Sequence, residues 1–463
     1  MHKFLIAALL GASAIAAPAT AAERTDPRSE AALSLYRDLI AFRTAEGQGQ
    51  VPAMAARLTE ELKAAGFIDA DITVQPMGET AYLLVRYAGT GEKAPIAFLG
   101  HMDVVDALPE DWERDPFTLT EDGDYFYGRG TIDNKLGIAM LTRAFAELKQ
   151  AGFSPDRDLY LAFSGDEETG MQTTKALVEA LSGEQPAFAL NSDAGGGVLN
   201  DGDGSPLAYM VQVAEKTFAT FDVTVRNEGG HSSRPRPDNA IYELADILKK
   251  VEAYQFPVQS NAVTREFFAA TGESMGGEAG AMLTRFAENP DDPEAAAAIA
   301  ADPSMVGFTR TTCVATMLDA GHAENALPQR ATATVNCRIF PGTEVSAVQT
   351  TLAEVGDNPD AQWVLRGDPT TSPVSDPRDD VNAAVAQAVH ARYPDLPLIP
   401  YMESGGTDGM HFRVAGIPTY AVSSRFMRRN QMFAHGLDER MRVDSFFAGL
   451  EHWPTIIRAL ASE

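Results

Sequence analysis

Five residues of types that commonly bind metal ions are spread along this chain, and each follows an apolar stretch: His101, Asp133, Glu168, Asp193 and His435. A buried strand is expected to end where such a stretch ends, and neighbouring parallel strands end at one edge of their sheet. Imidazole and carboxylate groups gathered at that edge predict a site for two divalent metal ions.

A spare acid stands beside one of these residues. The pair Glu167 and Glu168 follows the strand-like run 159–164, and adjacent side chains at the end of a strand point in different directions. One carboxylate can therefore hold metal while its neighbour transfers protons. Two adjacent carboxylates with these separate roles predict hydrolysis, with Glu167 as the residue that transfers the proton.

Each of these residues also has a simpler interpretation when it is taken alone. Asp103 is predicted to be a catalytic residue that accepts the second ring N–H of His101 and fixes its tautomer, but a purely structural hydrogen bond explains the pair equally well. Asp133 opens the helical pattern 136–152, where an N-cap is the alternative. Asp193 precedes a run of glycines, where it could begin a turn. Their combined spacing favours the metal site.

The elements that must position these residues follow from the pattern of apolar runs. From 72 to 211, strand-like runs alternate with helical ones, which indicates a parallel α/β sheet. From about 215 to 367 the order becomes strand, helix, two strands and helix, which indicates an inserted α+β domain. Within it, 255–308 is expected to form an insertion or lid with short helices of its own.

The first 22 residues predict a signal peptide. A basic start precedes an apolar stretch that is too short to span a bilayer, and Ala19-Thr20-Ala21 fits a small-x-small cleavage site. A retained membrane anchor is the alternative. The expected organisation is a signal peptide at 1–22, a catalytic domain in two parts at 23–213 and 372–463, and an inserted lid or dimerisation domain at 214–371. A periplasmic or secreted location follows.

Composition limits the partners of the exported protein. The chain has 37 Lys and Arg against 65 Asp and Glu, a net charge of −28, which argues against nucleic acid and anionic membranes as partners. Its two cysteines, Cys313 and Cys337, lie in neighbouring strand-like runs. An oxidising compartment would let them pair, and two buried free thiols are the open alternative.

Five motifs give the sequence a specific resemblance. The runs GHMDVV (100–105), YGRGTIDNK (127–135), SGDEETG (164–170), GGHSSRP (229–235) and GGTDG (405–409) have the order seen in the dinuclear zinc exopeptidase family of glutamate carboxypeptidase, carboxypeptidase S, aminoacylase, carnosinase and peptidase T. The resemblance implies an α/β catalytic domain with a mainly parallel central sheet and helices on both faces. It also implies an inserted α+β lid or dimerisation domain.

The resemblance assigns a role to each metal-binding residue. It implies that Asp133 bridges two ions, that His101 and Asp193 complete one of them, and that Glu168 and His435 complete the other. The ions are expected to be Zn²⁺, although Co²⁺ and Mn²⁺ also suit mixed His and carboxylate ligands. A hydroxide between the ions would be the nucleophile.

Several family positions remain open to other interpretations. Glu167 matches the general base of the family, whereas His411 and His452 compete with His435 for the last ligand position. Asn134 stands where many relatives have a second Asp, but that position is not a ligand. The resemblance associates Asp at position 193 more with aminopeptidases and dipeptidases than with acylases.

Substrate contacts are implied mainly in the inserted domain. His231 matches a residue that stabilises the oxyanion, often from a partner subunit, and Arg338 matches one that binds a substrate carboxylate. Asn325 and Lys216 match further contacts. Gly406 lies in a loop whose backbone N–H groups could bind the same carboxylate. An exposed histidine and a plain tight turn are the simpler interpretations of His231 and Gly406.

The resulting hypothesis is a zinc exopeptidase that hydrolyses an amide bond next to a free carboxylate in dipeptides or short peptides. A homodimer through the inserted domain is expected to be possible. An N-acyl amino acid deacylase on the same scaffold is the alternative within hydrolases. A noncatalytic peptide-binding protein is a third hypothesis, which the presence of Glu167 disfavours.

Overall fold

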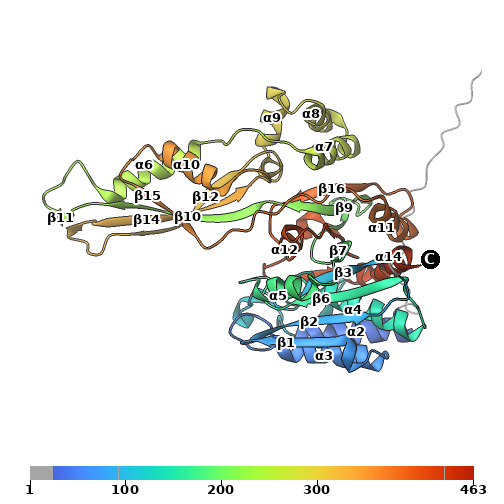
Figure 1. Cartoon of the computed structure of the whole chain (residues 1–463). Helices are drawn as coiled ribbons and strands as arrows, with labels where there is room; N and C mark the ends of the chain where they lie inside the picture. Colours follow the sequence, from blue (N-terminus) through green and yellow to red (C-terminus); the bar gives the residue numbers. More distant parts are fainter. Residues whose placement is uncertain (1–23, 25, 92, 432, 463) are drawn as a thin grey trace, which may run out of the picture.

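The computed structural model describes residues 24, 26–91, 93–431 and 433–462 (Figure 1). The signal peptide predicted at 1–22 lies outside the described residues. Within these ranges, no helix combines the length and the apolar character that crossing a membrane requires.

A ten-stranded mixed sheet forms the centre of the larger domain. Its strand order is β1–β2–β6–β3–β7–β17–β9–β8–β18, and β16 pairs with β9. The strands are β1 (Ile72–Met77), β2 (Thr80–Tyr87), β3 (Lys93–His101), β6 (Arg157–Ser164), β7 (Phe188–Asn191), β8 (Gly196–Leu199), β9 (Pro206–Glu215), β16 (Leu398–Glu403), β17 (Thr419–Ala421) and β18 (Phe426–Arg428). The strands β6, β3, β7 and β17 run parallel, so their carboxyl ends share one edge.

Helices cover both faces of this sheet, which explains why its inner strands are mainly apolar on both faces. Side chains of a strand alternate between faces. In β3, Ile96 and Phe98 pack on one side in the largest core cluster, while Ala97 and Leu99 pack on the other. The first side carries α2 (Pro27–Ala41), α3 (Val51–Ala64), α4 (Lys135–Gln150), α11 (Asp379–Arg392), α13 (Val443–Ala448) and α14 (His452–Ala461). The second carries α5 (Gln172–Leu181) and α12 (Gly409–Val414).

A second, four-stranded antiparallel sheet projects from the first (Figure 1). Its order is β12 (Thr312–Ala320), β14 (Arg330–Ile339), β10 (Thr217–Arg226) and β15 (Gln362–Arg366). The helices α6 (Ala240–Ala253) and α10 (Val345–Gly356) cover one face and enclose a separate apolar core. A short pair, β11 (Gly230–His231) and β13 (Ala326–Leu327), lies at the far end of this sheet in Figure 1.

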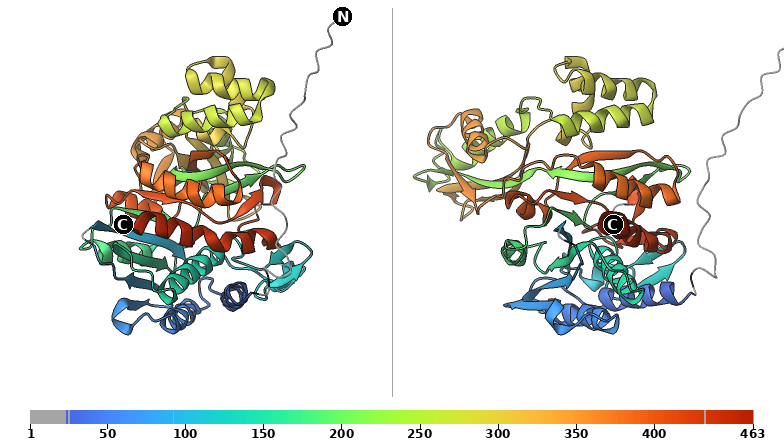
Figure 2. Two further views of the ribbon diagram at one scale, coloured as in Figure 1. Left: turned by 90° about the vertical axis from the view of Figure 1, so that its right-hand side faces the viewer. Right: turned by 45° about the vertical axis from the view of Figure 1, so that its right-hand side comes forward.

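Three helices follow α6 in the expected insertion: α7 (Ala262–Met275), α8 (Gly277–Glu288) and α9 (Pro293–Ala300). Phe268 and Phe286 of these helices pack with Ile399 of β16 in one apolar cluster. Both views of Figure 2 show these yellow helices at one end of the molecule and the blue helices α2 and α3 at the other, with the central sheet between them.

The predicted fold class is confirmed: an α/β domain with a mainly parallel central sheet carries an inserted α+β domain. Individual elements also lie close to their predicted bounds, since the helical pattern 136–152 corresponds to α4. The strands β4 (Thr120–Asp122), β5 (Tyr125–Tyr127) and β19 (Arg440–Arg442) form a small separate sheet. The limits predicted for the two domains stay a prediction.

Cys313 and Cys337 are disulfide-bonded and stand opposite each other on β12 and β14. We predict that replacing both by alanine lowers the free energy of unfolding by about 3 kcal/mol, because the bond restricts the unfolded chain. Denaturant unfolding measures this change, and reductant should destabilise the wild-type protein by a similar amount. An unchanged free energy of unfolding in both experiments would contradict the prediction.

Candidate active site

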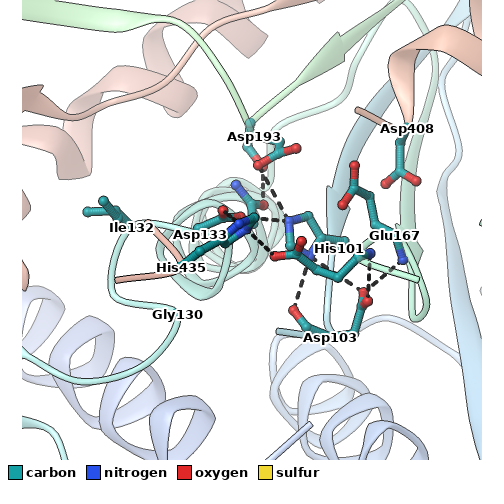
Figure 3. Close-up of polar contacts among 12 residues, drawn as sticks. His101, Asp103, Gly130, Ile132, Asp133, Glu167, Asp193, Asp408 and His435 are labelled. Carbon is teal, nitrogen blue, oxygen red and sulfur yellow. Dashed lines mark hydrogen bonds and ion pairs between the residues drawn. The ribbon is translucent and has the colours of Figure 1, made fainter. Parts of the chain in front are cut away.

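The five predicted metal-binding residues come together where the parallel strands end. Figure 3 shows four of them, His101, Asp133, Asp193 and His435, next to one another. His101 is the last residue of β3, Glu168 follows β6, and Asp193 follows β7. Asp133 precedes α4, and His435 lies in the connection between β18 and β19. The residues are therefore carried by segments that are up to 334 positions apart in the sequence, and the sheet brings them together.

Asp133 lies at the centre of this arrangement. Its Oδ1 is 2.9 Å from Nε2 of His101, and its Oδ2 is 3.1 Å from Nε2 of His435. The first histidine also lies 3.4 Å from Asp193, and the second lies 2.9 Å from Glu168. One carboxylate therefore belongs to two groups of three side chains.

Each of these groups has the composition of a metal site. Within each group, His101–Asp133–Asp193 and Asp133–Glu168–His435, one ligand atom per residue lies within 4.8 Å of the others. Mixed imidazole and carboxylate donors suit Zn²⁺, Co²⁺ and Mn²⁺. The residues present therefore fit two divalent cations that share Asp133.

The charges of the site also favour cations. Burial would lower the pKa of His101, but the charge of Asp193 and hydrogen bonds with neighbouring carboxylates raise it well above its usual value. Hydrogen bonds with Asp133 and Glu168 raise the pKa of His435 to about 10. These shifts report an excess of negative charge, which bound divalent cations would neutralise.

Asp103 differs in one respect from the sequence-based expectation. The Nδ1 of His101 is 3.0 Å from the backbone carbonyl of Asp103 and 3.5 Å from its carboxylate, so the carbonyl is the nearer acceptor. The carboxylate instead accepts the backbone N–H groups of Glu167 at 3.1 Å and Glu168 at 2.9 Å. Asp103 therefore fixes the backbone that carries both glutamates, and a catalytic role stays a prediction.

Glu167 is buried beside the two metal-binding groups. Burial, reinforced by the charges of Asp193 and Asp408, raises the pKa of Glu167 well above its usual value. One of its carboxylate oxygens lies within 4.8 Å of ligand atoms of His101 and Glu168. No hydrogen-bond donor from the described residues contacts its carboxylate, so Glu167 differs from Glu168, which is engaged by His435.

Two buried acids that sequence reasoning missed hold the site in place. The carboxylate of Glu439 accepts backbone N–H groups from Gly130 at 3.0 Å, Ile132 at 2.7 Å and Asp133 at 3.2 Å, and it pairs with Arg129 at 2.8 Å. It therefore fixes the turn that presents Asp133. No local sequence pattern links Glu439 to residues more than 300 positions away.

Asp408 is the second of these acids. Its carboxylate accepts hydrogen bonds from the hydroxyls of Ser164, at 2.7 Å, and Thr174, and burial raises its pKa to about 7. Figure 3 shows Asp408 next to Glu167. Its place inside the GGTDG motif was the signal in the sequence that could have identified it.

The two other histidines considered for the last ligand position, His411 and His452, lie outside the metal-binding groups found among the described residues. His452 is buried in α14, where it lies 3.2 Å from the hydroxyl of Tyr209. His411 lies in α12, where burial lowers its pKa. The geometry therefore favours His435 over both competitors.

The predicted substrate contacts fall into two separate places. Arg338, Lys216 and Gly406 lie where the two sheets meet: Arg338 donates to the carbonyl of Ser404 at 3.2 Å. The ammonium of Lys216 is buried and donates to the carbonyls of Gly307 at 3.0 Å and Arg310 at 2.8 Å, so it fastens the insertion to β10. Burial lowers its pKa to about 7.

His231 and Asn325 lie at the opposite end of the second sheet, where β11 is labelled in Figure 1. Both are exposed, and the backbone carbonyl of Asn325 accepts the N–H of Ser232 at 3.1 Å. The structure does not bring this pair to the metal-binding groups of the same chain. The roles predicted for all five substrate contacts stay predictions.

Comparisons with known proteins agree with this geometry. A model described as Peptidase family M20/M25/M40 matches residues 97–459. The N-fatty-acyl-amino acid synthase/hydrolase PM20D1 of Homo sapiens is 30% identical over 385 residues, covering 80% of this chain and 74% of that protein. Aminoacylase-1 of Mus musculus is 26% identical over 449 residues, covering 94% of this chain and 97% of that protein.

Solved structures share the fold. An M20 family metallo-carboxypeptidase from Sulfolobus solfataricus matches with a TM-score of 0.70 at 17% identity, covering 94% of this chain and 99% of that chain. A dinuclear metal binding peptidase of the M20 family from Bacillus subtilis matches with a TM-score of 0.56 at 14% identity, covering 92% of this chain and 96% of that chain.

The chain belongs to the peptidase family M20/M25/M40. It is a metal-dependent hydrolase of the exopeptidase type, acting as a peptidase or on N-acyl amino acids, which confirms the class predicted from its motifs. The Bacillus subtilis peptidase is described as dinuclear metal binding, and the described side chains of this chain offer suitable groups for two ions.

We predict that Glu439→Gln lowers the affinity for divalent metal by about 10- to 100-fold, because an amide cannot replace a carboxylate that accepts several N–H groups. Metal titration of the folded variant measures this change. Glu113→Gln, at an exposed acid, is the matched control and should bind metal as the wild type does. Unchanged affinity in the Glu439 variant would show that the turn does not need this carboxylate.

Proposed function

We propose that this protein hydrolyses the amide bond next to a free carboxylate in dipeptides or other short peptides. The observation that carries the proposal is the position of Asp133, which is shared by two metal-binding groups, with the unengaged carboxylate of Glu167 beside them. Divalent cations held by these groups, with Zn²⁺ as the expected ion, would polarise the scissile carbonyl and acidify the attacking water.

The protein's own residues account for the proton transfers. The carboxylate of Glu167 accepts the proton of the attacking water and returns it to the nitrogen of the leaving amine. Its burial excludes bulk water from this transfer. Asp103 holds the backbone of Glu167 and Glu168 in place, since its carboxylate accepts hydrogen bonds from both of their backbone N–H groups. The carboxylate of Glu167 is thus free to transfer protons, while that of Glu168 would bind metal.

The free carboxylate of the substrate would be bound where the two sheets meet. The side chain of Arg338 is half-buried there, and no carboxylate among the described residues forms an ion pair with it. A guanidinium binds a carboxylate through two parallel hydrogen bonds. Gly406 lies two residues after Ser404, whose carbonyl accepts from Arg338, and would supply its backbone N–H to the same ligand.

N-acyl amino acids are the second candidate substrates. Two observations favour them: relatives named as an N-fatty-acyl-amino acid hydrolase and an aminoacylase, and an apolar cavity close to the metal-binding groups. Dipeptides and N-acyl amino acids both carry the free carboxylate that Arg338 is proposed to bind. Assays of dipeptides against N-acetyl and long-chain acyl amino acids separate the candidates, and turnover of acylated substrates alone would exclude the dipeptide assignment.

We also propose that His231 acts across a homodimer formed through the inserted domain. It lies far from the metal-binding groups of its own chain, as Figure 1 shows for β11. The edge strand β12 leaves Val314, Met317 and Leu318 from 59% to 65% exposed. An edge strand with exposed apolar side chains is suited to pair with a second copy.

A periplasmic or secreted location is part of the same proposal. The disulfide between Cys313 and Cys337 supports it, because such bonds persist in oxidising compartments.

We predict that Glu167→Ala lowers kcat by roughly 10²- to 10⁴-fold, because the proton transfers lose their acceptor. Steady-state kinetics on a dipeptide panel measures the loss, and metal analysis should show nearly unchanged metal content. Chelation should also abolish wild-type activity, and restoration with one metal at a time identifies the native ion. Wild-type activity in the Glu167 variant would remove this residue from the mechanism.

We predict that mixing inactive His231→Ala with inactive Glu167→Ala restores activity if subunits exchange. In a mixed dimer, the His231 variant's metal site receives an intact His231 from its partner. Random exchange of equal amounts should restore about a quarter of the wild-type activity. Mixtures that remain inactive although mixed dimers form would show that His231 does not act across the interface.

A further inference from the structure

The side chain of Arg425 joins two loops that present predicted metal ligands. Its Nε donates to the carbonyl of Gly195 at 3.3 Å, and its Nη1 donates to the carbonyl of Ile132 at 3.3 Å. Gly195 lies two residues after Asp193, and Ile132 directly precedes Asp133. The guanidinium therefore links the two backbone segments that carry the carboxylates of one predicted metal-binding group.

The backbone of Arg425 is fixed to the same glycine-rich segment. Gly197 donates its N–H to the carbonyl of Arg425 at 2.8 Å, where β18 pairs with β8. Gly196 has a positive φ of 107°, and a Cβ at this residue would lie 2.8 Å from that carbonyl and 3.0 Å from Cγ of Arg425. A residue with a side chain at position 196 would therefore push the arginine away from the segment.

The chemistry of the guanidinium suits it to hold backbone without disturbing the ligands. Both of its acceptors are neutral carbonyls, so these hydrogen bonds do not occupy the carboxylates of Asp133 and Asp193. A charged donor forms stronger hydrogen bonds than a neutral one. Arg425 is half-buried, which partly shields these hydrogen bonds from bulk water. One arginine can thus hold the two segments at a fixed separation.

The two linked segments differ in their other support. Asp133 has a second charged anchor, because the carboxylate of Glu439 accepts its N–H at 3.2 Å. The segment after Asp193 has a neutral anchor instead, the hydroxyl of Tyr401, which accepts the N–H of Gly195 at 3.1 Å. Loss of the guanidinium should therefore displace Asp193 more than the shared Asp133.

We propose that Arg425 is a positioning residue for one of the two metal ions. That ion is the one that His101, Asp133 and Asp193 would bind. Arg425 acts through backbone carbonyls and sets the separation of the two carboxylates. The ion at Glu168 does not depend on this link, so the two metal positions respond differently to the loss of the arginine. The inference rests on the pair of ions on which the proposed function also rests.

The first test is the replacement Arg425→Met, which keeps an unbranched side chain and removes the donors. It should lower the affinity for one of the two ions by about 10- to 100-fold, as is typical when a group that orients a metal ligand is lost. Calorimetric titration of the metal-free protein with Zn²⁺ measures this change. Arg330→Met is the matched control: this arginine of β14 has a 55% exposed side chain, and the variant should bind both ions as the wild type does.

Anomalous diffraction from crystals of Arg425→Met at limiting Zn²⁺ identifies the weakened position. The peak beside Asp193 should lose occupancy, while the peak beside Glu168 should keep it. Equal loss at both positions, or loss only beside Glu168, would overturn the proposal. So would a folded Arg425→Met protein, as judged by thermal unfolding, that binds both ions with wild-type affinity.

Chemical rescue distinguishes this role from a general effect on folding. Arg425 lines the apolar cavity of about 310 Å³ between the insertion and the central sheet, so Arg425→Ala leaves space that a small ion can enter. Guanidinium at millimolar concentration should restore the affinity for the weakened ion. Urea, which has a similar shape but no charge, and sodium chloride at equal ionic strength should not. Equal effects of guanidinium and urea would contradict the proposal.

The conservative variant Arg425→Lys should have an intermediate affinity, since an ammonium donates hydrogen bonds but lacks the planar arrangement of donors that spans both carbonyls. An affinity for the weakened ion as low as that of Arg425→Met would show that the donated hydrogen bonds are not what the site requires.

Metal occupancy separates this proposal from the proposed function. If the wild type binds two ions but hydrolyses no amide, and Arg425→Met loses the ion beside Asp193, the proposed hydrolysis fails and the role of Arg425 stands. If amides are hydrolysed and Arg425→Met keeps both ions, the role of Arg425 fails alone.

Discussion

The shared carboxylate of Asp133 is the constraint on which the site depends. Its two oxygens face different imidazoles, those of His101 and His435, so a single side chain completes two groups of ligands. Each histidine also contacts the other acid of its group: His101 lies 3.4 Å from Asp193, and His435 lies 2.9 Å from Glu168. Carboxylates gathered this closely and partly buried are costly unless cations neutralise them. Two divalent ions would meet that requirement.

Other parts of the structure keep this carboxylate and its neighbours in place. Two of the loops that present predicted ligands are each held by a buried acid from another segment: Glu439 binds the backbone before α4, and Asp103 binds the backbone after β6. These acids use backbone N–H groups as partners, which satisfies their charge without occupying the metal ligands. The parallel ends of β3, β6 and β7 then set the spacing of the whole site.

The sequence was sufficient to predict the fold class, helices such as α4, and the side chains that come together at the sheet edge, because these features leave local signals. Apolar runs mark the strands, helical periodicity marks α4 and α6, and His101, Asp133 and Glu168 stand within recognisable motifs. Contacts between distant segments leave no such signal. Glu439 could not be linked to Asp133, and the buried position of Lys216 beneath the insertion was not foreseen. The sequence also left open whether Cys313 and Cys337 pair, since adjacent strands bring two thiols together only in the correct register.

The distance between His231 and the metal-binding groups also could not be predicted from the sequence. The motif around His231 predicts a substrate contact, but only the fold shows that β11 lies at the far end of the second sheet. Together with the exposed β12 strand, this separation makes a second copy of the chain part of the proposed site.

Anomalous diffraction from crystals of the metal-loaded protein tests most directly whether two metal ions share Asp133. Two anomalous peaks about 3.5–4 Å apart are expected, one on each side of the Asp133 carboxylate. One peak would have His101 and Asp193 as neighbours, and the other Glu168 and His435. A single peak bound by all five side chains, or ions located away from Asp133, would contradict this expectation.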